Sequence, residues 1–280
     1  MQRALSTHLI VGHRLNTVWL ERIQGAGFPL VEIFCARQHL DYRNKAQVEE
    51  LAFWFADSEL KLHSLHSPMY SDDVWGKTGP GAVVSITETS KPKRLESVDE
   101  IKRALEVAEK IPFRYLIQHV GVSGEEYSDE AVEAAFRALE EISLFARHRG
   151  VEVLLENIPN KLSSAERLNY FLNTTHLGLG VCLDTGHANM MEGVAAAFEI
   201  LGPRIRSTHI HDNNGVDDVH LYPLLAKGGS TDWAAVMKLL RSRAEQYPLL
   251  LELREAPEFT HALDSAREVI ERLENFSNHV

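Results

Sequence analysis

The sequence has little cysteine, no long hydrophobic run and no excess of positive charge. Its 280 residues include only two cysteines, Cys35 and Cys182, which are too few for a disulfide framework. The apolar runs, such as residues 249–251, are far shorter than the roughly 20 residues that span a bilayer. Lys and Arg number 29 against 40 Asp and Glu, a formal net charge of −11. These features exclude a disulfide scaffold and a membrane-spanning protein, and they disfavour binding to phosphate backbones.

The composition is that of an ordinary globular protein, with 44% apolar and 25% charged residues, enough for a sizeable core. The first eight residues show no long apolar signal core. Together with the scarcity of cysteine, this predicts a reducing, cytoplasmic location. The chain has 14 histidines, and several of them stand beside Asp or Glu, which is the first indication of a functional site.

Short apolar runs alternate with longer amphipathic stretches along the chain. In residues 130–139, Val132, Phe136 and Leu139 recur at helical spacing, whereas residues 151–155 form a short aliphatic run typical of a buried strand. These patterns predict strands at residues 5–11, 30–35, 62–66, 115–120, 151–156, 180–184, 206–211 and 249–253. They predict helices at residues 15–25, 45–58, 98–110, 129–149, 164–174, 194–201, 233–246 and 260–275.

Eight strand–helix units predict an α/β fold, a single (β/α)8 TIM barrel spanning residues 1–280, since roughly 250 residues is typical of that fold. The alternative is an open doubly wound sheet, which usually carries a glycine-rich phosphate turn after its first strand. Residues 12–15 (Gly-His-Arg-Leu) are not such a turn. The one long irregular stretch, residues 67–97, follows the third strand. We therefore expect it to lie over the mouth of the barrel as a lid, with a mobile surface loop as the alternative.

Polar side chains stand where six successive strands are predicted to end, and the carboxyl ends of barrel strands build the active sites of this fold. These residues are His66, His119, Glu156, Asp184 with the following His187, His209 with His211 and Asp212, and Glu252. The loop after the seventh strand adds Asp218 and His220. Carboxylates and imidazoles are ligands for divalent Mn, Zn, Co or Mg. An unpaired charge inside a barrel is costly, so the pattern predicts a metal site rather than packing.

Four motifs resemble the xylose-isomerase-like TIM-barrel superfamily. They are residues 155–157 (Leu-Glu-Asn), 182–187 (Cys-Leu-Asp-Thr-Gly-His), 209–212 (His-Ile-His-Asp) and 218–220 (Asp-Val-His). That superfamily includes sugar phosphate isomerases and epimerases, ketose 3-epimerases, inosose dehydratases and the more distant endonuclease IV branch. The resemblance covers nearly the whole chain, and the Leu-Asp-Thr-Gly-His run is its most specific part.

The resemblance implies a set of metal ligands. One ion would be held by Glu156, Asp184, His209 and Glu252. Further ligand positions of the endonuclease IV pattern, which binds three zinc ions, are matched by His66, His119, His187, Asp218 and His220. In the isomerase-like members often only one ion is bound, and His187 contacts the substrate. His209 and His211 face the same side of a strand; the His-x-x-Asp spacing favours His209 as the ligand and His211 as an outer-sphere or substrate contact.

The first functional hypothesis is a divalent-metal-dependent isomerase or epimerase of a sugar, sugar phosphate or keto-polyol. It would work by proton transfer through a metal-stabilised enediolate. Glu156 and Glu252 are the expected acid/base pair, while they also ligate the ion. The expected substrate contacts are His187, His211, His66 and Trp75. This hypothesis predicts a small-molecule partner and neither nucleic acid nor membrane; a homo-oligomer is compatible with the sequence.

Two other reactions use the same residues. Endonuclease IV-like phosphodiester hydrolysis would need phosphate contacts from Lys and Arg, and the net charge and the acidic residues 70–75 oppose it. A metal-dependent dehydratase or lyase on a keto-polyol would share the ion and the base. The chain has residues 218–220 (Asp-Val-His) where ketose 3-epimerases carry a substrate-binding arginine, so the substrate stays open. A non-enzymatic binding barrel is the remaining alternative.

Overall fold

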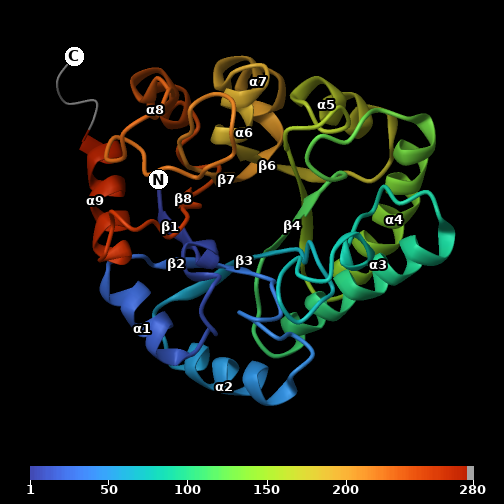
Figure 1. Cartoon of the computed structure of the whole chain (residues 1–280), viewed down its shortest axis with the longest axis horizontal. Helices are drawn as coiled ribbons and strands as arrows, with labels where there is room; N and C mark the ends of the chain where they lie inside the picture. Colours follow the sequence, from blue (N-terminus) through green and yellow to red (C-terminus); the bar gives the residue numbers. More distant parts are fainter. Residues whose placement is uncertain (276–280) are drawn as a thin grey trace.

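The computed structural model of the chain describes residues 1–275. Eight parallel strands form the centre of the molecule, and helices surround them (Figure 1). The strands are β1 (Arg3–Ser6), β2 (Leu30–Phe34), β3 (Lys61–His66), β4 (Tyr115–His119), β5 (Glu152–Glu156), β6 (Gly180–Asp184), β7 (Ile205–His209) and β8 (Leu249–Leu251). Consecutive strands are neighbours from β1 to β7, and β8 pairs with β1.

The barrel closes between β7 and β8. A parallel bridge joins Ile210 to Leu251, and the backbone N–H of Ile210 donates to the carbonyl of Leu250 at 2.8 Å. The N–H of Glu252 returns a hydrogen bond to the carbonyl of Ile210 at 3.1 Å. The chain is therefore a single (β/α)8 barrel, which confirms the predicted fold class.

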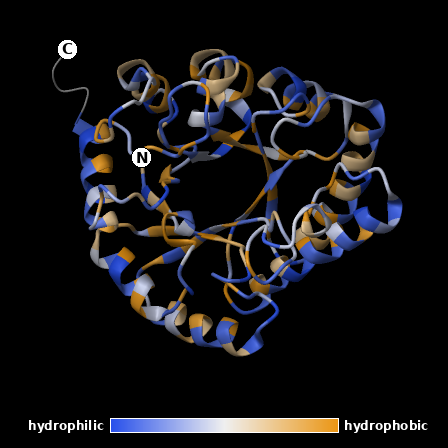
Figure 2. Ribbon diagram, in the orientation of Figure 1, coloured by the Kyte–Doolittle hydropathy of each residue, from blue (hydrophilic) through white to orange (hydrophobic). Residues whose placement is uncertain are grey.

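Hydrophobic and hydrophilic residues alternate along the helices (Figure 2), and the apolar ones, such as Leu139 and Ile142, are buried in the core around the barrel. They are α1 (Thr17–Gly25), α2 (Lys45–Ala56), α3 (Lys91–Leu105), α4 (Asp129–Arg147), α5 (Ala165–Thr174), α6 (Thr185–Met190), α7 (Val194–Leu201), α8 (Trp233–Arg241) and α9 (Ala262–Asn275). The side chain of Ser128 caps α4 by accepting from the N–H of Ala131, a typical start signal. No helix among the described residues is long and apolar enough to cross a membrane.

The strands separate an apolar barrel floor from a polar mouth. Successive side chains on a strand point to opposite faces, so Leu154 and Glu156 of β5 share one face, as do Cys182 and Asp184 of β6. Leu154 and Cys182 belong to a small buried apolar cluster, while the intervening Leu155 joins the large core beneath the helices. The last inward-facing residue of each strand therefore stands at the mouth.

Two elements have bounds that differ from the sequence prediction, and both differences affect the site. The first strand ends at Ser6 rather than at residue 11, because residues Thr7–Ile10 form a 3-10 turn, η1, whose His8 N–H is accepted by the Ser6 side chain at 3.3 Å. Helix α3 begins at Lys91 rather than at residue 98, with Pro92 in its first turn, where a missing N–H is tolerated. The expected irregular stretch 67–97 is therefore shorter and ends at Ser90.

The loop of residues 67–90 is ordered by its own backbone hydrogen bonds. An antiparallel bridge joins Tyr70 to Val83, and the N–H of Ser71 donates to the carbonyl of Ala82 at 2.8 Å. The Trp75 ring lies 5.1 Å from that of Phe34 and 5.9 Å from that of His8. The loop thus reaches residues that follow β1 and end β2, so it borders the mouth.

Candidate metal centre

Four acidic and imidazole side chains converge at the mouth from the ends of adjacent strands. Glu156, Asp184 and His209 end β5, β6 and β7, and Glu252 directly follows β8. One donor atom of each lies within 4.8 Å of the others, and all four residues are buried. Nδ1 of His209 is 3.0 Å from Oε1 of Glu156, 3.3 Å from Oε2 of Glu252 and 3.9 Å from Oδ2 of Asp184. We call these four residues the ring; they are the ones predicted to share an ion.

Asn157 joins the ends of β5 and β6 beside the ring. Its side-chain N–H donates to the carbonyl of Asp184 at 2.9 Å, and its oxygen accepts from the N–H of Asp184 at 2.9 Å. Asp184 also caps the short helix α6, since its Oδ1 accepts from the N–H of His187 at 2.6 Å. These local hydrogen bonds fix the Asp184 carboxylate relative to Glu156 and bring His187 back toward the ring.

A second ligand group shares Glu156 with the ring. Nε2 of His119 and Nε2 of His66 lie 3.1 Å and 3.4 Å from Oε2 of Glu156, and 3.2 Å from each other. Nδ1 of His66 is 2.9 Å from the carbonyl of Ser67, so it carries a proton, and Nε2 is the nitrogen that faces the other donors. Because Oε1 of Glu156 faces His209 and Oε2 faces the histidine pair, the two oxygens of one carboxylate serve two groups.

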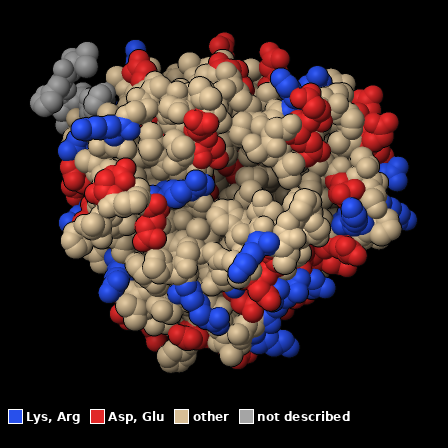
Figure 3. All heavy atoms as spheres, in the orientation of Figure 1, with Lys and Arg blue, Asp and Glu red and all other residues tan. Residues whose placement is uncertain are grey.

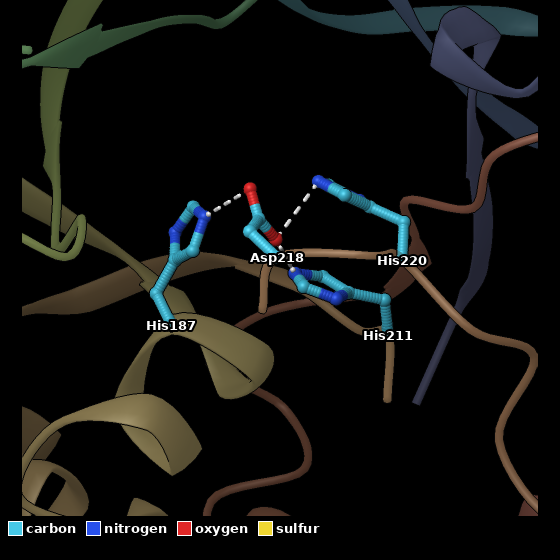
Figure 4. Close-up of side chains that lie close together, drawn as sticks. All are labelled: His187, His211, Asp218 and His220. Atoms are coloured by element: carbon cyan, nitrogen blue, oxygen red, sulfur yellow. Dashed lines mark hydrogen bonds and ion pairs between the residues drawn. The ribbon is translucent and has the colours of Figure 1, made fainter. Parts of the chain in front are cut away.

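A third group, His187, His211, Asp218 and His220, lies beside the ring (Figure 4). Nε2 of His187 is 3.3 Å from Oδ2 of Asp218, and Nε2 of His220 is 3.2 Å from Oδ1. Nε2 of His211 lies 3.1 Å from Oδ1 of Asp184, which links this group to the ring. Oδ1 of Asp218 is buried, and its contacts with His220 and His211 are ion pairs that lack hydrogen-bond geometry.

The mouth concentrates negative charge that no lysine or arginine balances. It holds the buried carboxylates of Glu32, Glu156, Asp184 and Glu252 and the half-buried carboxylate of Asp218. Within residues 1–275, every ion-pair partner of these carboxylates is a histidine. Buried charges normally are paired or coordinate metals, so this excess favours cations at the mouth.

The same charges shift the pKa values of their partners. Burial alone would raise the pKa of Glu156, but the imidazoles of His209 and His119 hold it well below its usual range. Burial opposes protonation of His187, yet Asp184 and Asp218 raise its pKa well above the ordinary value. For His209, burial is likewise outweighed by surrounding acidic groups, including Glu252, which raise its pKa. Without an ion, protons on the imidazoles supply the positive charge that the carboxylates require.

The donor set fits a divalent ion. Three carboxylates and one imidazole in the ring, and the histidine-rich groups beside it, are oxygen and nitrogen ligands of the kind that bind Zn, Mn or Co. Oδ1 of Asp218 and Oε1 of Glu32 are buried and accept no hydrogen bond, although each lies beside a histidine nitrogen. These oxygens have acceptor capacity that a cation could use. The donors do not select one metal.

The predicted substrate contacts are distributed over the mouth. His66, His187 and His211 lie among the ligand groups, so each can contact either an ion or a substrate. Trp75 stands at the border of the mouth, beside Phe34, whose ring stacks on that of His66 at 4.3 Å. The structure therefore brings all predicted site residues to one end of the barrel; their individual roles stay predictions.

Two residues were missed or left undecided by the sequence patterns. His8 fell inside the strand predicted at 5–11, but β1 ends at Ser6, so His8 stands at the mouth like the other strand-end residues. Its Nδ1 lies 3.1 Å from the carbonyl of Leu253 and its ring 4.7 Å from that of His220. Burial lowers its pKa well below the ordinary value, so it is neutral. For Glu32 of β2, the sequence left open whether it lines the mouth or forms a buried ion pair. In the structure it contacts His209.

The chain belongs to the xylose isomerase-like TIM barrel family, whose model matches residues 20–276. This agrees with the motifs at the ends of β5 to β7. Among curated relatives, the uncharacterized protein y4fM of Sinorhizobium fredii is 28% identical over 225 residues, covering 74% of this chain and 71% of the relative.

Solved structures with the same fold include sugar epimerase-like proteins and a dehydratase. A D-tagatose 3-epimerase-like protein has a TM-score of 0.78 at 24% identity, covering 99% of this chain and 98% of the other. The IOLI protein, solved with a zinc atom, has a TM-score of 0.78 at 18% identity over 100% of both chains. The probable 3-DHS dehydratase AsbF from Bacillus anthracis has a TM-score of 0.71 at 17% identity over 98% of both. These likenesses establish the shared fold.

Proposed function

We propose that the protein is a divalent-metal-dependent isomerase or epimerase of a small sugar, sugar phosphate or keto-polyol. The observation that carries this proposal is the convergence of two buried glutamates from different strands on one histidine nitrogen. Oε1 of Glu156, from β5, and Oε2 of Glu252, after β8, lie 3.0 Å and 3.3 Å from Nδ1 of His209. A substrate bound at the ring would have two carboxylates within reach of its reacting carbons.

The ring residues would have different roles in metal binding and proton transfer. Glu156, Asp184, His209 and Glu252 would hold the ion, which when bound stabilises negative charge developing on substrate oxygens. Because the pKa of Glu156 is held well below its usual range, this carboxylate is ionised and can accept a proton from the carbon beside the carbonyl. Glu252 would return the proton. His187, whose raised pKa favours the protonated form, would donate a hydrogen bond to a substrate hydroxyl.

The direct test is exchange of a carbon-bound proton with solvent. Purified protein loaded with Mn, Co or Zn is incubated in D2O with a panel of ketoses, keto-polyols and their phosphates, and the C1 and C3 signals are followed by NMR. We expect Glu156→Gln to lower exchange by roughly 10²- to 10⁴-fold, the usual contribution of a general base. Glu152→Gln, at the other end of the same strand, is the matched control and should exchange normally. Retained exchange in Glu156→Gln would remove Glu156 from the acid/base role.

Phosphodiester hydrolysis is the second candidate, because a specific feature favours it. Glu156 directs one oxygen to the ring and the other toward His66 and His119, and a third ligand group adjoins them. Sites that hold two or more ions suit transfer at phosphate esters. Against it, Lys and Arg are scattered among acidic side chains on the face shown in Figure 3 and form no continuous basic band there.

Elemental analysis and a nicking assay separate the candidates. One Mn or Co per chain would support the isomerase, whereas three zinc ions per chain together with cleavage of a plasmid containing abasic sites would support the hydrolase. Release of water from the substrate, seen as a mass change without epimer formation, would indicate the dehydratase that shares this ion and base. Protein that retains no metal after purification and reloading would favour a binding barrel.

A further inference from the structure

Glu32 is a buried carboxylate at the mouth that the proposed proton transfer does not use. It lies in the middle of β2, paired in register with Ser6 of β1 and Ser64 of β3, and it is fully buried. We infer that Glu32 is a positioning residue that fixes the imidazole of His209 so that Nδ1 is presented to the ion. The inference rests on the proposed metal centre and adds a residue to it.

The contacts of His209 divide between its two nitrogens. Nε2 lies 3.1 Å from Oε1 and 3.2 Å from Oε2 of Glu32. Nδ1, on the other side of the imidazole, lies 3.0 Å from Oε1 of Glu156 and 3.3 Å from Oε2 of Glu252. One imidazole nitrogen therefore faces the metal ligands, and the other faces a carboxylate that is outside the ligand groups.

This arrangement selects a tautomer once an ion is bound. Ionised carboxylates accept hydrogen bonds and cannot donate them, and both nitrogens of His209 face carboxylates. When an ion replaces the proton on Nδ1, the nitrogen facing Glu32 keeps its proton. A neutral His209 then has its lone pair on Nδ1, which is the atom that points to the other ring residues. A carboxylate that accepts from the outer nitrogen of a metal-bound histidine also increases the donor strength of the inner one.

Glu32 is itself held in place by a neighbouring strand. The hydroxyl of Ser64 donates to Oε2 of Glu32 at 2.7 Å, which fixes the carboxylate against rotation. Within residues 1–275, the ion-pair partner of Glu32 is His209, and no lysine or arginine takes that place. Burying a carboxylate without a cation beside it costs desolvation free energy. Positive charge on His209, or on an ion bound to His209, would offset that cost.

The experiment measures binding of zinc alone, by competition with a chromophoric chelator at fixed pH. The variants are Glu32→Gln, which removes the charge at constant shape, and Ser64→Ala, which removes the hydroxyl that orients Glu32. We expect Glu32→Gln to weaken zinc binding by roughly 10- to 100-fold, the usual effect of losing an outer-sphere partner, and Ser64→Ala to weaken it less. Glu100→Gln, a buried carboxylate paired with Arg43 and Arg103, is the control and should bind zinc normally.

A spectroscopic measurement distinguishes positioning from general loss of structure. Nitrogen NMR of 15N-histidine-labelled protein should assign the proton of His209 to Nε2 and zinc to Nδ1 in the wild type. Glu32→Gln should show a mixture of Nδ1-bound and Nε2-bound His209 in the zinc-loaded protein, while its melting temperature in a chelator stays close to that of the wild type. Should Glu32→Gln fail to fold, Ser64→Ala provides the same two measurements.

The outcomes separate this inference from the proposed function. Wild-type affinity and an unchanged tautomer in Glu32→Gln would overturn the positioning role and leave the metal centre intact. Failure of the wild type itself to bind zinc would overturn both. Weakened zinc binding in Glu32→Gln in a protein without proton-exchange activity would support the positioning role and reject only the isomerase.

Discussion

At the scale of single residues, Asp184 combines two roles that can be separated. Its carboxylate is a member of the ring and also caps α6 by accepting from the N–H of His187. Asparagine is as good an N-cap as aspartate, but it lacks the charge that attracts a divalent ion. Replacement by asparagine therefore preserves the local fold and removes a ligand charge.

We expect Asp184→Asn to fold and to lose metal-induced stabilisation. Its melting temperature in a chelator should stay close to that of the wild type or fall slightly, because the α6 cap is kept while the ion pairs with His187 and His211 are lost. Zinc affinity should fall by more than the roughly 10- to 100-fold that loss of an outer-sphere partner causes. Thermal melts with and without zinc measure both quantities. Asp232→Asn, at the cap of α8, is the control, and equal zinc stabilisation in both variants would contradict the ligand role.

At the scale of elements, the loop of residues 67–90 determines what borders the mouth. Its hydrogen-bonded backbone places Trp75 beside His8 and Phe34. Arg37, which follows β2, forms an ion pair of 2.6 Å with Asp73 of the loop. The loop is a compact structure with internal hydrogen bonds, which favours a preformed wall for substrate. The lid interpretation stays a prediction about its motion.

Replacing Trp75 should affect substrate binding more than turnover. We expect Trp75→Ala to raise KM by roughly two- to tenfold, as expected from about 0.5–1.5 kcal/mol of aromatic contact, with kcat within a factor of about two, since Trp75 is outside the ligand groups. Steady-state kinetics on the substrate identified by proton exchange measure this split. Val74→Ala, an exposed neighbour, should leave both constants unchanged. A large loss of kcat with constant KM would instead place Trp75 in the reaction.

At the scale of the whole molecule, charge is distributed so that one end of the barrel needs cations. The buried carboxylates at the mouth have only imidazoles as ion-pair partners among the described residues. Acidic neighbours raise the pKa values of His187 and His209 well above the ordinary value, although burial acts in the opposite direction. Protons and metal ions therefore compete for the same imidazole nitrogens.

Metal affinity should consequently rise with pH. Below the raised pKa values of His187 and His209, both imidazoles hold protons that an ion must displace; above those values no proton is displaced and affinity is constant. The apparent association constant should increase by about tenfold per pH unit for each proton released. Titration calorimetry of zinc in buffers of different ionisation enthalpy counts those protons between pH 6 and 8. Zinc binding that releases no proton anywhere in that range would contradict the assigned ligands.

Much of the site could be predicted because it follows from local rules. Side chains alternate along a strand, and parallel strands of a barrel end at one rim, so Glu156, Asp184 and His209 could be placed together without knowing a single distance. Asp218 and His220 were found through their motif. In contrast, His8 was not predicted as a site residue. The apolar residues after it extended the predicted strand to residue 11, whereas in the structure Ser6 caps a turn that begins at Thr7.

The sequence by itself determined the barrel and the cluster of acidic and imidazole residues at its strand ends, because strand periodicity and the residues at strand ends are local properties of the chain. The choice of the four ring residues within that cluster came from the resemblance to the family. Only the tertiary structure decided that the two oxygens of Glu156 face different ligand groups and that His211 contacts Asp184. It alone decided that Glu32 stands behind His209. These contacts join residues separated by up to 177 positions, and they depend on strand register and barrel closure, which no local pattern encodes.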